Sequence, residues 1–237
     1  MARRAILITG GARGLGRAIA DSLAPDHDIA ITWNTAAEEA AVFASAHPRA
    51  LVLQADLETA PPAQIIAAVI ARFGRLDGLV NNAAMGAREP GPEAFDQGLA
   101  KRVFAVNVTA PLALVGAALP HLGAGASVVN ISSANARFPA MAAPVFSASK
   151  AALENLTLGL AKALGPRGIR VNAVAPGAVE RPYAPGPPEA IRQFTDRTAL
   201  GRPAQAAEVA QAVRFLLSDA ASAITGTVLD ASGGDRL

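Results

Sequence analysis

The 237-residue sequence contains no cysteine and only three histidines, one tryptophan and one tyrosine. Without cysteine there is no disulfide, no catalytic thiolate and no cysteine-ligated zinc site. The histidines, at positions 27, 47 and 121, do not have the spacing of metal ligands. We therefore expect no metal site.

An excess of charge of one sign is also missing. The 21 Lys and Arg residues are nearly balanced by 19 Asp and Glu residues, which leaves a net charge of +2. So small an excess gives no field that could hold a phosphate backbone. We expect no nucleic-acid partner.

Long hydrophobic runs are absent as well. The apolar residues 5–8 are followed by Thr9 and glycine, whereas a signal peptide needs an apolar run of roughly 7–15 residues. The uncharged residues 103–120 are interrupted by Asn107 and Pro111, so no membrane span is expected. The sequence predicts a soluble, cytoplasmic protein.

Apolar strands alternate with helical patterns along the whole chain. With 51% hydrophobic and 17% charged residues, the chain is expected to fold, and its length suits one domain. The patterns predict strands at 5–8, 29–33, 51–54, 76–80, 127–131, 169–174 and 228–229, and helices at 15–23, 36–46, 63–73, 95–119, 146–164 and 206–217. This alternation is typical of an α/β, doubly wound parallel sheet of about seven strands, with helices on both faces.

A glycine-rich loop joins the first predicted strand to the first helix. Residues 9–16 read Thr-Gly-Gly-Ala-Arg-Gly-Leu-Gly. Glycine lets the backbone turn tightly and approach a pyrophosphate, which the helix N-terminus stabilises. The loop predicts a dinucleotide site, with a plain tight turn as the alternative. The predicted contacts are Gly10, Gly14, Leu15 and Gly16.

The second predicted strand gives a hint of which dinucleotide binds. It ends in Thr-Trp-Asn-Thr at 32–35, without the acid that binds the ribose 2′-hydroxyl of NAD. The next acids, Glu38 and Glu39, fall inside the predicted helix. Arg13 in the glycine loop can pair with a 2′-phosphate, although it can also be a solvated loop charge. We expect NADP(H) rather than NAD(H), with Arg13 and Asn34 among the contacts.

Several motifs in order make the chain resemble the short-chain dehydrogenase/reductase family over nearly its whole length. They are the glycine loop, Asp56-Leu57, Asn-Asn-Ala-Ala at 81–84 with Ala84 where glycine is usual, Asn107, Ile-Ser-Ser at 131–133 and Pro176-Gly177. The resemblance implies a Rossmann-type fold. It also implies cofactor contacts from Asp56, Leu57, Asn82, Ala83, Ala84, Lys150, Pro176, Gly177 and Val179.

The sequence departs from the catalytic motif of that family at one residue. Family members carry Tyr-x-x-x-Lys with a serine 13 residues before the tyrosine; here Phe146 precedes Lys150, and Ser133 lies 13 residues before Phe146. The resemblance implies that Ser133 polarises a carbonyl, that Lys150 holds the nicotinamide ribose, and that Asn107 anchors a proton-relaying water. The phenol that donates the proton is missing.

Phe146 leaves four interpretations open. It is an introduced variant; or another group donates the proton; or the substrate needs little protonation, as an iminium or enone does; or the protein binds NADP(H) without turnover, in a sensing or regulatory role. Because Ser133, Lys150 and Asn107 all remain, we favour an oxidoreductase that transfers hydride between NADP(H) and a small carbonyl or alcohol. A methyltransferase would share only the glycine loop.

The resemblance also suggests a substrate lid and an oligomer. A Pro/Gly-rich lid is expected at about 178–194, with Tyr183 and Asn135 near the substrate. Tyr183 or Arg181 is a candidate replacement donor. Family members form dimers or tetramers through their long central helices, so a homotetramer or homodimer is expected.

Overall fold

The computed structural model describes residues 3–86, 92–180 and 188–235, which contain a parallel seven-stranded sheet. The strands are β1 (Arg4–Ile8), β2 (His27–Trp33), β3 (Leu51–Gln54), β4 (Gly78–Asn81), β5 (Ser127–Ile131), β6 (Arg170–Pro176) and β7 (Val228–Ala231). Their order is β3-β2-β1-β4-β5-β6-β7. The direction of winding reverses between β1 and β4, which confirms the predicted doubly wound sheet.

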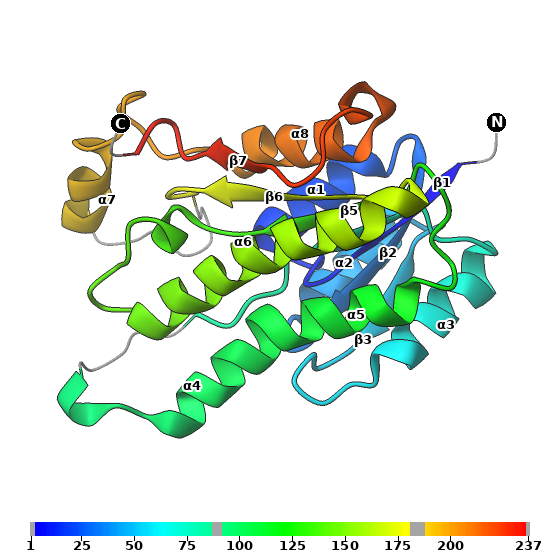
Figure 1. Ribbon diagram of the computed structural model, residues 1–237, viewed down its shortest axis with the longest axis horizontal. Helices are drawn as coiled ribbons and strands as arrows, with labels where there is room; N and C mark the ends of the chain where they lie inside the picture. Colours follow the sequence, from blue (N-terminus) through cyan, green and yellow to red (C-terminus); the bar gives the residue numbers. More distant parts are fainter. Residues whose placement is uncertain (1–2, 87–91, 181–187, 236–237) are drawn as a thin grey trace.

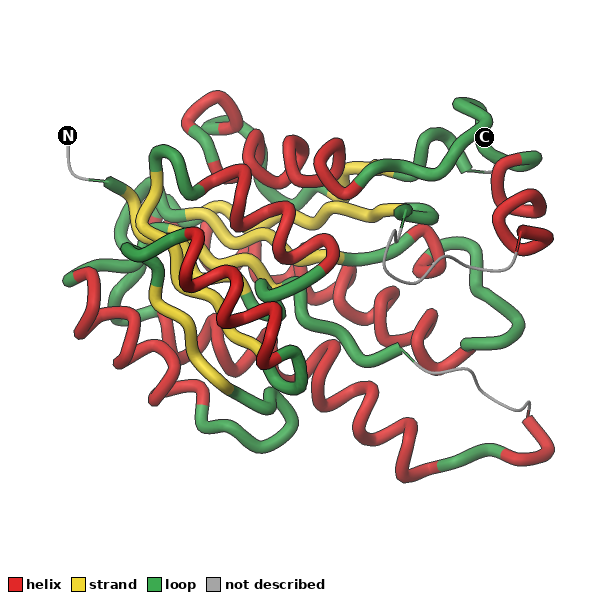
Figure 2. Tube along the Cα trace, turned by 180° about the vertical axis from the view of Figure 1, so that it is seen from behind, coloured by secondary structure: helices red, strands yellow, loops and turns green. Residues whose placement is uncertain are grey.

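Helices cover both faces of the sheet (Figure 2). They are α1 (Gly14–Leu23), α2 (Ala37–Ala46), α3 (Pro62–Phe73), α4 (Gln97–Phe104), α5 (Ala110–Ala118), α6 (Pro144–Leu164), α7 (Pro188–Thr195) and α8 (Ala206–Leu217).

Successive side chains of the central strand β1 divide between two cores. Ile6 and Ile8 pack with α1, α2 and α8 on one face, whereas Leu7 packs with α3, α5 and α6 on the other. All three side chains are fully buried. A strand that is covered on both faces therefore appears in the sequence as a continuous apolar run.

The predicted helix at 95–119 is not one regular helix. Between α4 and α5 the chain forms a π-helical turn, Ala105–Thr109, with Asn107 at its centre. The turn widens the helix where the Asn107 side chain bonds to another loop, and such turns are frequent at functional sites.

The stretch Gln97–Ala118 as a whole is long and apolar enough to cross a membrane by length and composition alone. The stretch therefore meets the length and composition criteria for a membrane span despite Asn107 and Pro111, contrary to the expectation from the sequence. In the fold, Leu114 and Val115 of this stretch are buried in the core between the sheet and its helices, together with residues of α3. The core helix of a soluble α/β protein meets the same criteria.

One helix was not predicted. α7 begins at Pro188, directly after a proline-rich segment. Proline is favoured in the first turn of a helix because no N–H is needed there. The remaining predicted strands and helices are present with small shifts of their ends, as for β4, which begins at Gly78 rather than at residue 76.

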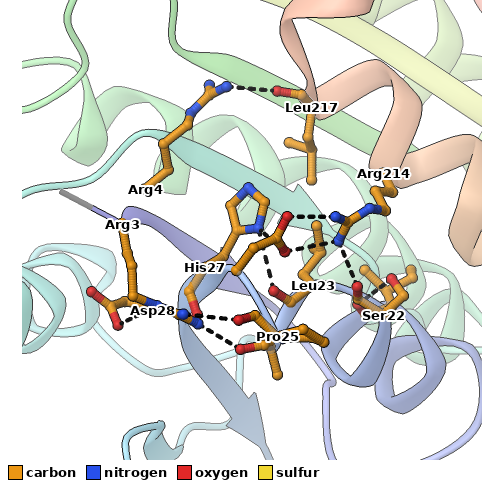
Figure 3. A network of polar contacts seen from close by, with 12 residues as sticks. Arg3, Arg4, Ser22, Leu23, Pro25, His27, Asp28, Arg214 and Leu217 are labelled. Carbon is orange, nitrogen blue, oxygen red and sulfur yellow. Dashed lines mark hydrogen bonds and ion pairs between the residues drawn. The ribbon is translucent and has the colours of Figure 1, made fainter. Parts of the chain in front are cut away.

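At the amino ends of the strands, a polar network joins α8 to the turn between α1 and β2 (Figure 3). The Arg214 guanidinium donates to the Ser22 carbonyl at 2.6 Å and to Asp26 Oδ1 at 2.9 Å. Arg3 donates to the carbonyl of His27 at 2.6 Å. The hydrogen bond from Arg214 is the main cause that lowers the pKa of Asp26 from 3.8 to about 2. The network fixes the end of the sheet opposite to the loops that are described next.

Candidate active site

A cavity of about 700 Å³ lies where the carboxyl ends of β1, β2, β4, β5 and β6 meet. This is the place where a doubly wound sheet binds its ligand. Predicted residues that line it are Gly10, Arg13, Gly14, Leu15, Gly16, Asn34, Asp56, Leu57, Asn82, Ala83, Ala84, Ser133, Phe146, Lys150, Pro176, Gly177 and Val179. Motifs that lie far apart in the chain therefore form one site.

The glycine loop forms an anion cradle at the start of α1. Gly10 and Gly14 have φ angles of 65° and 58°, which L side chains rarely adopt. A Cβ on Gly16 would lie 2.5 Å from Asn82 Nδ2 and would also collide with the Gly10 carbonyl, so only glycine fits. No side chain caps this helix, and its first turn has no acidic residue. Its N–H groups are therefore placed for a pyrophosphate.

Thr9 and Asn82 hold this cradle against the loop after β4. Thr9 Oγ1 accepts the backbone N–H groups of Asn82 and Ala83, both at 3.0 Å. Asn82 Nδ2 donates to the carbonyls of Thr9 at 2.9 Å and Gly10 at 3.1 Å. The Asn82 amide therefore orders the loop that lines the cavity.

The segment after β2 offers the cavity no carboxylate. The last residues of β2 and the segment after it line the cavity from Thr32 to Ala36, and none of them is acidic. Glu38 and Glu39 lie in the first turn of α2, outside the lining. Arg13 is exposed and lines the cavity. The surroundings of this segment therefore suit a 2′-phosphate better than a ribose hydroxyl that needs an acid.

Sequence reasoning missed a charged pair at the same end of the cavity. Arg102 Nε on α4 donates to Glu58 Oε2 at 3.2 Å, and both residues line the cavity. The two residues lie 44 positions apart, and no local pattern in the sequence joins them. Other lining residues that were not predicted are Ala12, Thr32, Trp33, Thr35, Ala36, Ala55, Met85, Gly86, Val106, Ile131, Ser132 and Glu180. All of these except Val106 lie at the end of a strand or within five residues after it, a position from which they could have been predicted.

At the other end of the cavity Lys150 is buried. Phe146 and Lys150 are one helical turn apart on α6, so both side chains face β5. Lys150 Nζ donates to the Ile131 carbonyl at 2.7 Å and lies 5.7 Å from the centre of the Phe146 ring. Burial, which disfavours the charged form, lowers the pKa of Lys150 to about 8.

Ser133 lies two residues after the end of β5 and also lines the cavity. Its Oγ accepts the backbone N–H of Asn135 at 3.2 Å, which leaves its hydroxyl hydrogen for another acceptor. Asn135 lies in the short 3₁₀ turn Ala134–Ala136 and is not among the lining residues. The proposed donors Arg181 and Tyr183 lie outside the described residues.

Asn107 lies behind the cavity rather than in its lining. The side chain is fully buried; Oδ1 accepts the Met85 N–H at 2.7 Å, and Nδ2 donates to the Met85 carbonyl and to Ser149 Oγ, both at 3.0 Å. These bonds join the loop after β4 to α6. The expected role of Asn107 in a proton relay stays a prediction.

The described ends of the expected lid contact the end of β6. A Cβ on Gly177 would lie 2.8 Å from the Phe194 ring and 3.1 Å from Ser232. Val179 pairs with Ala204 in an isolated parallel bridge. Phe194 of α7 therefore packs on Gly177, and α7 lies near the end of β6 (Figure 1).

Comparison with known proteins gives matches over nearly the whole chain. Residues 10–235 match the family model described as enoyl-(acyl carrier protein) reductase. An oxidoreductase of Methylorubrum extorquens is 38% identical over 97% of this chain and 96% of its own. The cis-4-hydroxycyclohexanecarboxylate dehydrogenase of Sinomonas cyclohexanicum is 36% identical, over 98% and 96%. A short-chain dehydrogenase of Burkholderia cenocepacia in complex with NADP has a TM-score of 0.93 at 36% identity, over 99% and 98%.

Proposed function

We propose a function on the premise that the chain belongs to the short-chain dehydrogenase/reductase family of oxidoreductases. The protein transfers hydride between NADP(H) and a small carbonyl or alcohol substrate. The observation that carries this proposal is that the glycine cradle, Ser133 and Lys150 line one continuous cavity. The cavity volume is within the range of about 300–1,000 Å³ that is usual for ligand sites.

The choice of NADP(H) rests on the lining beside the glycine loop. Arg13 supplies a guanidinium, and the turn after β2 supplies no carboxylate to repel a 2′-phosphate. The Burkholderia cenocepacia dehydrogenase, which is similar to this chain, was solved with NADP. We therefore assign Arg13 and Asn34 to the 2′-phosphate end of the dinucleotide.

The dinucleotide, when bound, supplies or accepts the hydride. The N–H groups at the start of α1 hold its pyrophosphate. Lys150 has two further N–H groups besides the one donated to Ile131, and one of these suits a hydroxyl of the nicotinamide ribose. The Ser133 hydroxyl can donate to a substrate oxygen, which polarises a carbonyl.

Phe146 affects only the proton transfer in this scheme. Its ring can pack against substrate but has no acidic hydrogen. General acid catalysis contributes typically about 10²–10⁴-fold, and the positioning of cofactor and substrate is a separate contribution. We therefore expect slow but measurable turnover.

Dinucleotide binding and turnover test this proposal. NADPH and NADH are titrated by fluorescence, and NADPH oxidation is followed over a panel of aldehydes and cyclic ketones, with alcohols for the reverse reaction. cis-4-Hydroxycyclohexanecarboxylate belongs in the panel because a relative is named for it. We expect tighter binding of NADPH than of NADH and turnover of at least one substrate. Failure to bind either dinucleotide would refute the proposal.

We also propose a soluble cytoplasmic homodimer or homotetramer. Phe104 and Leu112 on the α4–α5 stretch and Leu158 on α6 are 37%, 44% and 42% exposed. Large apolar side chains at this exposure on neighbouring helices suit a contact with a second copy. Light scattering on the eluted protein tests the proposed assembly, and a monomer at all concentrations would refute it.

A further inference from the structure

We propose that Lys150 itself is the proton donor of this site and replaces the tyrosine hydroxyl that Phe146 lacks. The inference rests on the proposed hydride transfer. It gives Lys150 a role beyond holding the ribose: its ammonium touches the substrate oxygen, directly or through one water in the space that a phenol hydroxyl would fill.

The lining of the cavity at this end narrows the choice of donor. Among the described residues that β5, α6 and the chain after β6 contribute to the lining, the titratable side chains are Lys150 and Glu180. Glu180 is exposed at the rim, whereas Lys150 is 3% exposed and lies between the end of β5 and the Phe146 ring. Lys150 is therefore the group that is placed to deliver a proton inside the cavity.

The contacts of Lys150 Nζ leave it able to donate a proton to a substrate. Its bond to the Ile131 carbonyl fixes the side chain, and the face of the Phe146 ring stabilises the cation before reaction. With one N–H donated to Ile131, two N–H groups remain for the cavity, one for a ribose hydroxyl and one for the substrate oxygen. A hydroxyl on residue 146 would compete with the substrate for these N–H groups.

Neighbouring charges do not hold the proton on Lys150. Glu154, one turn further along α6, accepts from Ser132 Oγ at 2.8 Å and lies 3.9 Å from Arg137 Nε. Glu180 is at the exposed rim, and Arg102 on α4 is paired with Glu58. Burial alone accounts for the lowered pKa of Lys150, about 8 instead of 10.5. A pKa near the working pH suits a general acid.

The proposed reaction joins a hydride transfer to the carbonyl carbon with a proton transfer to its oxygen. Reduced cofactor, when bound, would supply the hydride: a C–H bond of the dihydronicotinamide breaks and leaves it oxidised, a C–H bond forms at the carbonyl carbon, and the π pair of the carbonyl moves to oxygen. The oxygen takes a proton from Nζ, so that an O–H bond forms and an N–H bond breaks. Lys150 is left as a neutral amine and regains a proton from solvent. A cationic iminium would meet the ammonium with like charge, so this donor favours neutral carbonyl substrates.

A cycle of four proteins tests the donor: the unmodified chain, Lys150→Arg, Phe146→Tyr and the double variant. Arginine keeps the positive charge but does not release its proton. In the unmodified background we expect Lys150→Arg to lower kcat by at least about 10²-fold. NADPH affinity should stay within a few-fold of the unmodified value. In the Phe146→Tyr background the same change should cost much less, because the phenol donates.

An equal loss of kcat in both backgrounds would overturn the proposal, since Lys150 would then act only on the cofactor. Turnover by Lys150→Arg at the unmodified rate would overturn it too, as would the loss of turnover in Tyr183→Phe while Lys150→Arg remains active. Lys162→Arg, an exposed change on the same helix, controls for the substitution itself. If the unmodified chain binds no dinucleotide, the proposed function fails with the inference.

A second measurement does not depend on activity or on the folding of a Lys150 variant. The chain has three lysines, at positions 101, 150 and 162, so ¹³C labelling of the lysine ε carbon gives three signals. Lys101→Arg and Lys162→Arg identify two of them. We expect the Lys150 signal to titrate near pH 8 in the folded protein. A Lys150 that stays charged above about pH 10, the usual range for lysine, would overturn the proposal.

Discussion

Asn107 holds both backbone polar groups of Met85: its Oδ1 accepts the Met85 N–H at 2.7 Å, and its Nδ2 donates to the Met85 carbonyl at 3.0 Å. The amide also reaches Ser149 Oγ on α6 at 3.0 Å. The π turn at 105–109 brings this side chain out of the helix register and between the two elements. The loop that lines the cavity after β4 is thereby tied to the helix that carries Phe146 and Lys150.

Asn107→Ala should loosen this connection. Leaving the buried partners unsatisfied costs about 1–3 kcal/mol each, so we expect a loss of about 2–4 kcal/mol in the free energy of unfolding. NADPH binding should weaken as the loop becomes less ordered. Denaturant unfolding and NADPH titration check both effects. Ser149→Ala, which removes one of the three bonds, should cost less, and an equal cost for the two variants would contradict this account.

Gly16→Ala should disrupt the anion cradle. The new methyl group would collide with the Gly10 carbonyl and with Asn82 Nδ2, so the loop must shift. We expect NADPH affinity to fall by at least about 10-fold, which corresponds to about 1.4 kcal/mol. Fluorescence titration measures it. Gly123→Ala, at a position where a Cβ meets nothing within 4 Å, is the matched control. Unchanged affinity in Gly16→Ala would show that the pyrophosphate does not bind there.

Arg13→Ala should change the preference between dinucleotides. Loss of a charge-assisted bond to the 2′-phosphate costs about 1.5–3 kcal/mol, so NADPH binding should weaken about 10- to 100-fold while NADH binding changes little. Comparing both dissociation constants separates the two effects. Arg17→Ala removes an arginine that is paired with Asp21 on the same helix, and it should leave both constants unchanged. If Arg13→Ala weakens the binding of NADPH and NADH equally, Arg13 does not bind the 2′-phosphate.

Acid stability should depend on Asp26. Its pKa is held at about 2, below the ordinary 3.8, mainly by the bond from Arg214. A depressed carboxyl pKa contributes stability above about pH 4, and that contribution is lost as the pH falls through about 2. Asp26→Asn should flatten the fall in unfolding free energy over this interval. The effect should shrink in high salt because Asp26 is half-exposed.

Unfolding curves between pH 4 and pH 2 measure this change. Asp196→Asn, at an exposed aspartate after α7, serves as the control and should leave the slope unaltered. A wild-type slope in Asp26→Asn would show that the Arg214 bond does not persist in solution.

Regular secondary structure was predictable wherever the local pattern alone determines it. The bounds of β3 and α8 agree with the predicted 51–54 and 206–217, because a short apolar run between polar residues and an amphipathic helix each leave a clear pattern in the sequence. The residues that follow the strands also formed one cavity, since the carboxyl ends of parallel strands meet at one edge.

Features that depend on distant partners were not predictable. The π turn exists where Asn107 bonds to a residue 22 positions earlier, and Arg102 pairs with Glu58 across 44 positions. The low pKa of Lys150 follows from burial that only the packed fold produces. α7 follows a run of prolines, which favours loops and hides the start of a short helix.

The most direct test of the central claim is NADPH oxidation by the unmodified chain and by Phe146→Tyr over one carbonyl panel. We predict that both proteins bind NADPH alike, that the unmodified chain turns over slowly, and that the tyrosine variant gains at least about 10-fold in kcat. That result would mean that the cavity is a complete hydride-transfer site with a weaker proton donor. If neither protein oxidises NADPH with any carbonyl, although both bind it, the assignment of this cavity as a reductase site is contradicted.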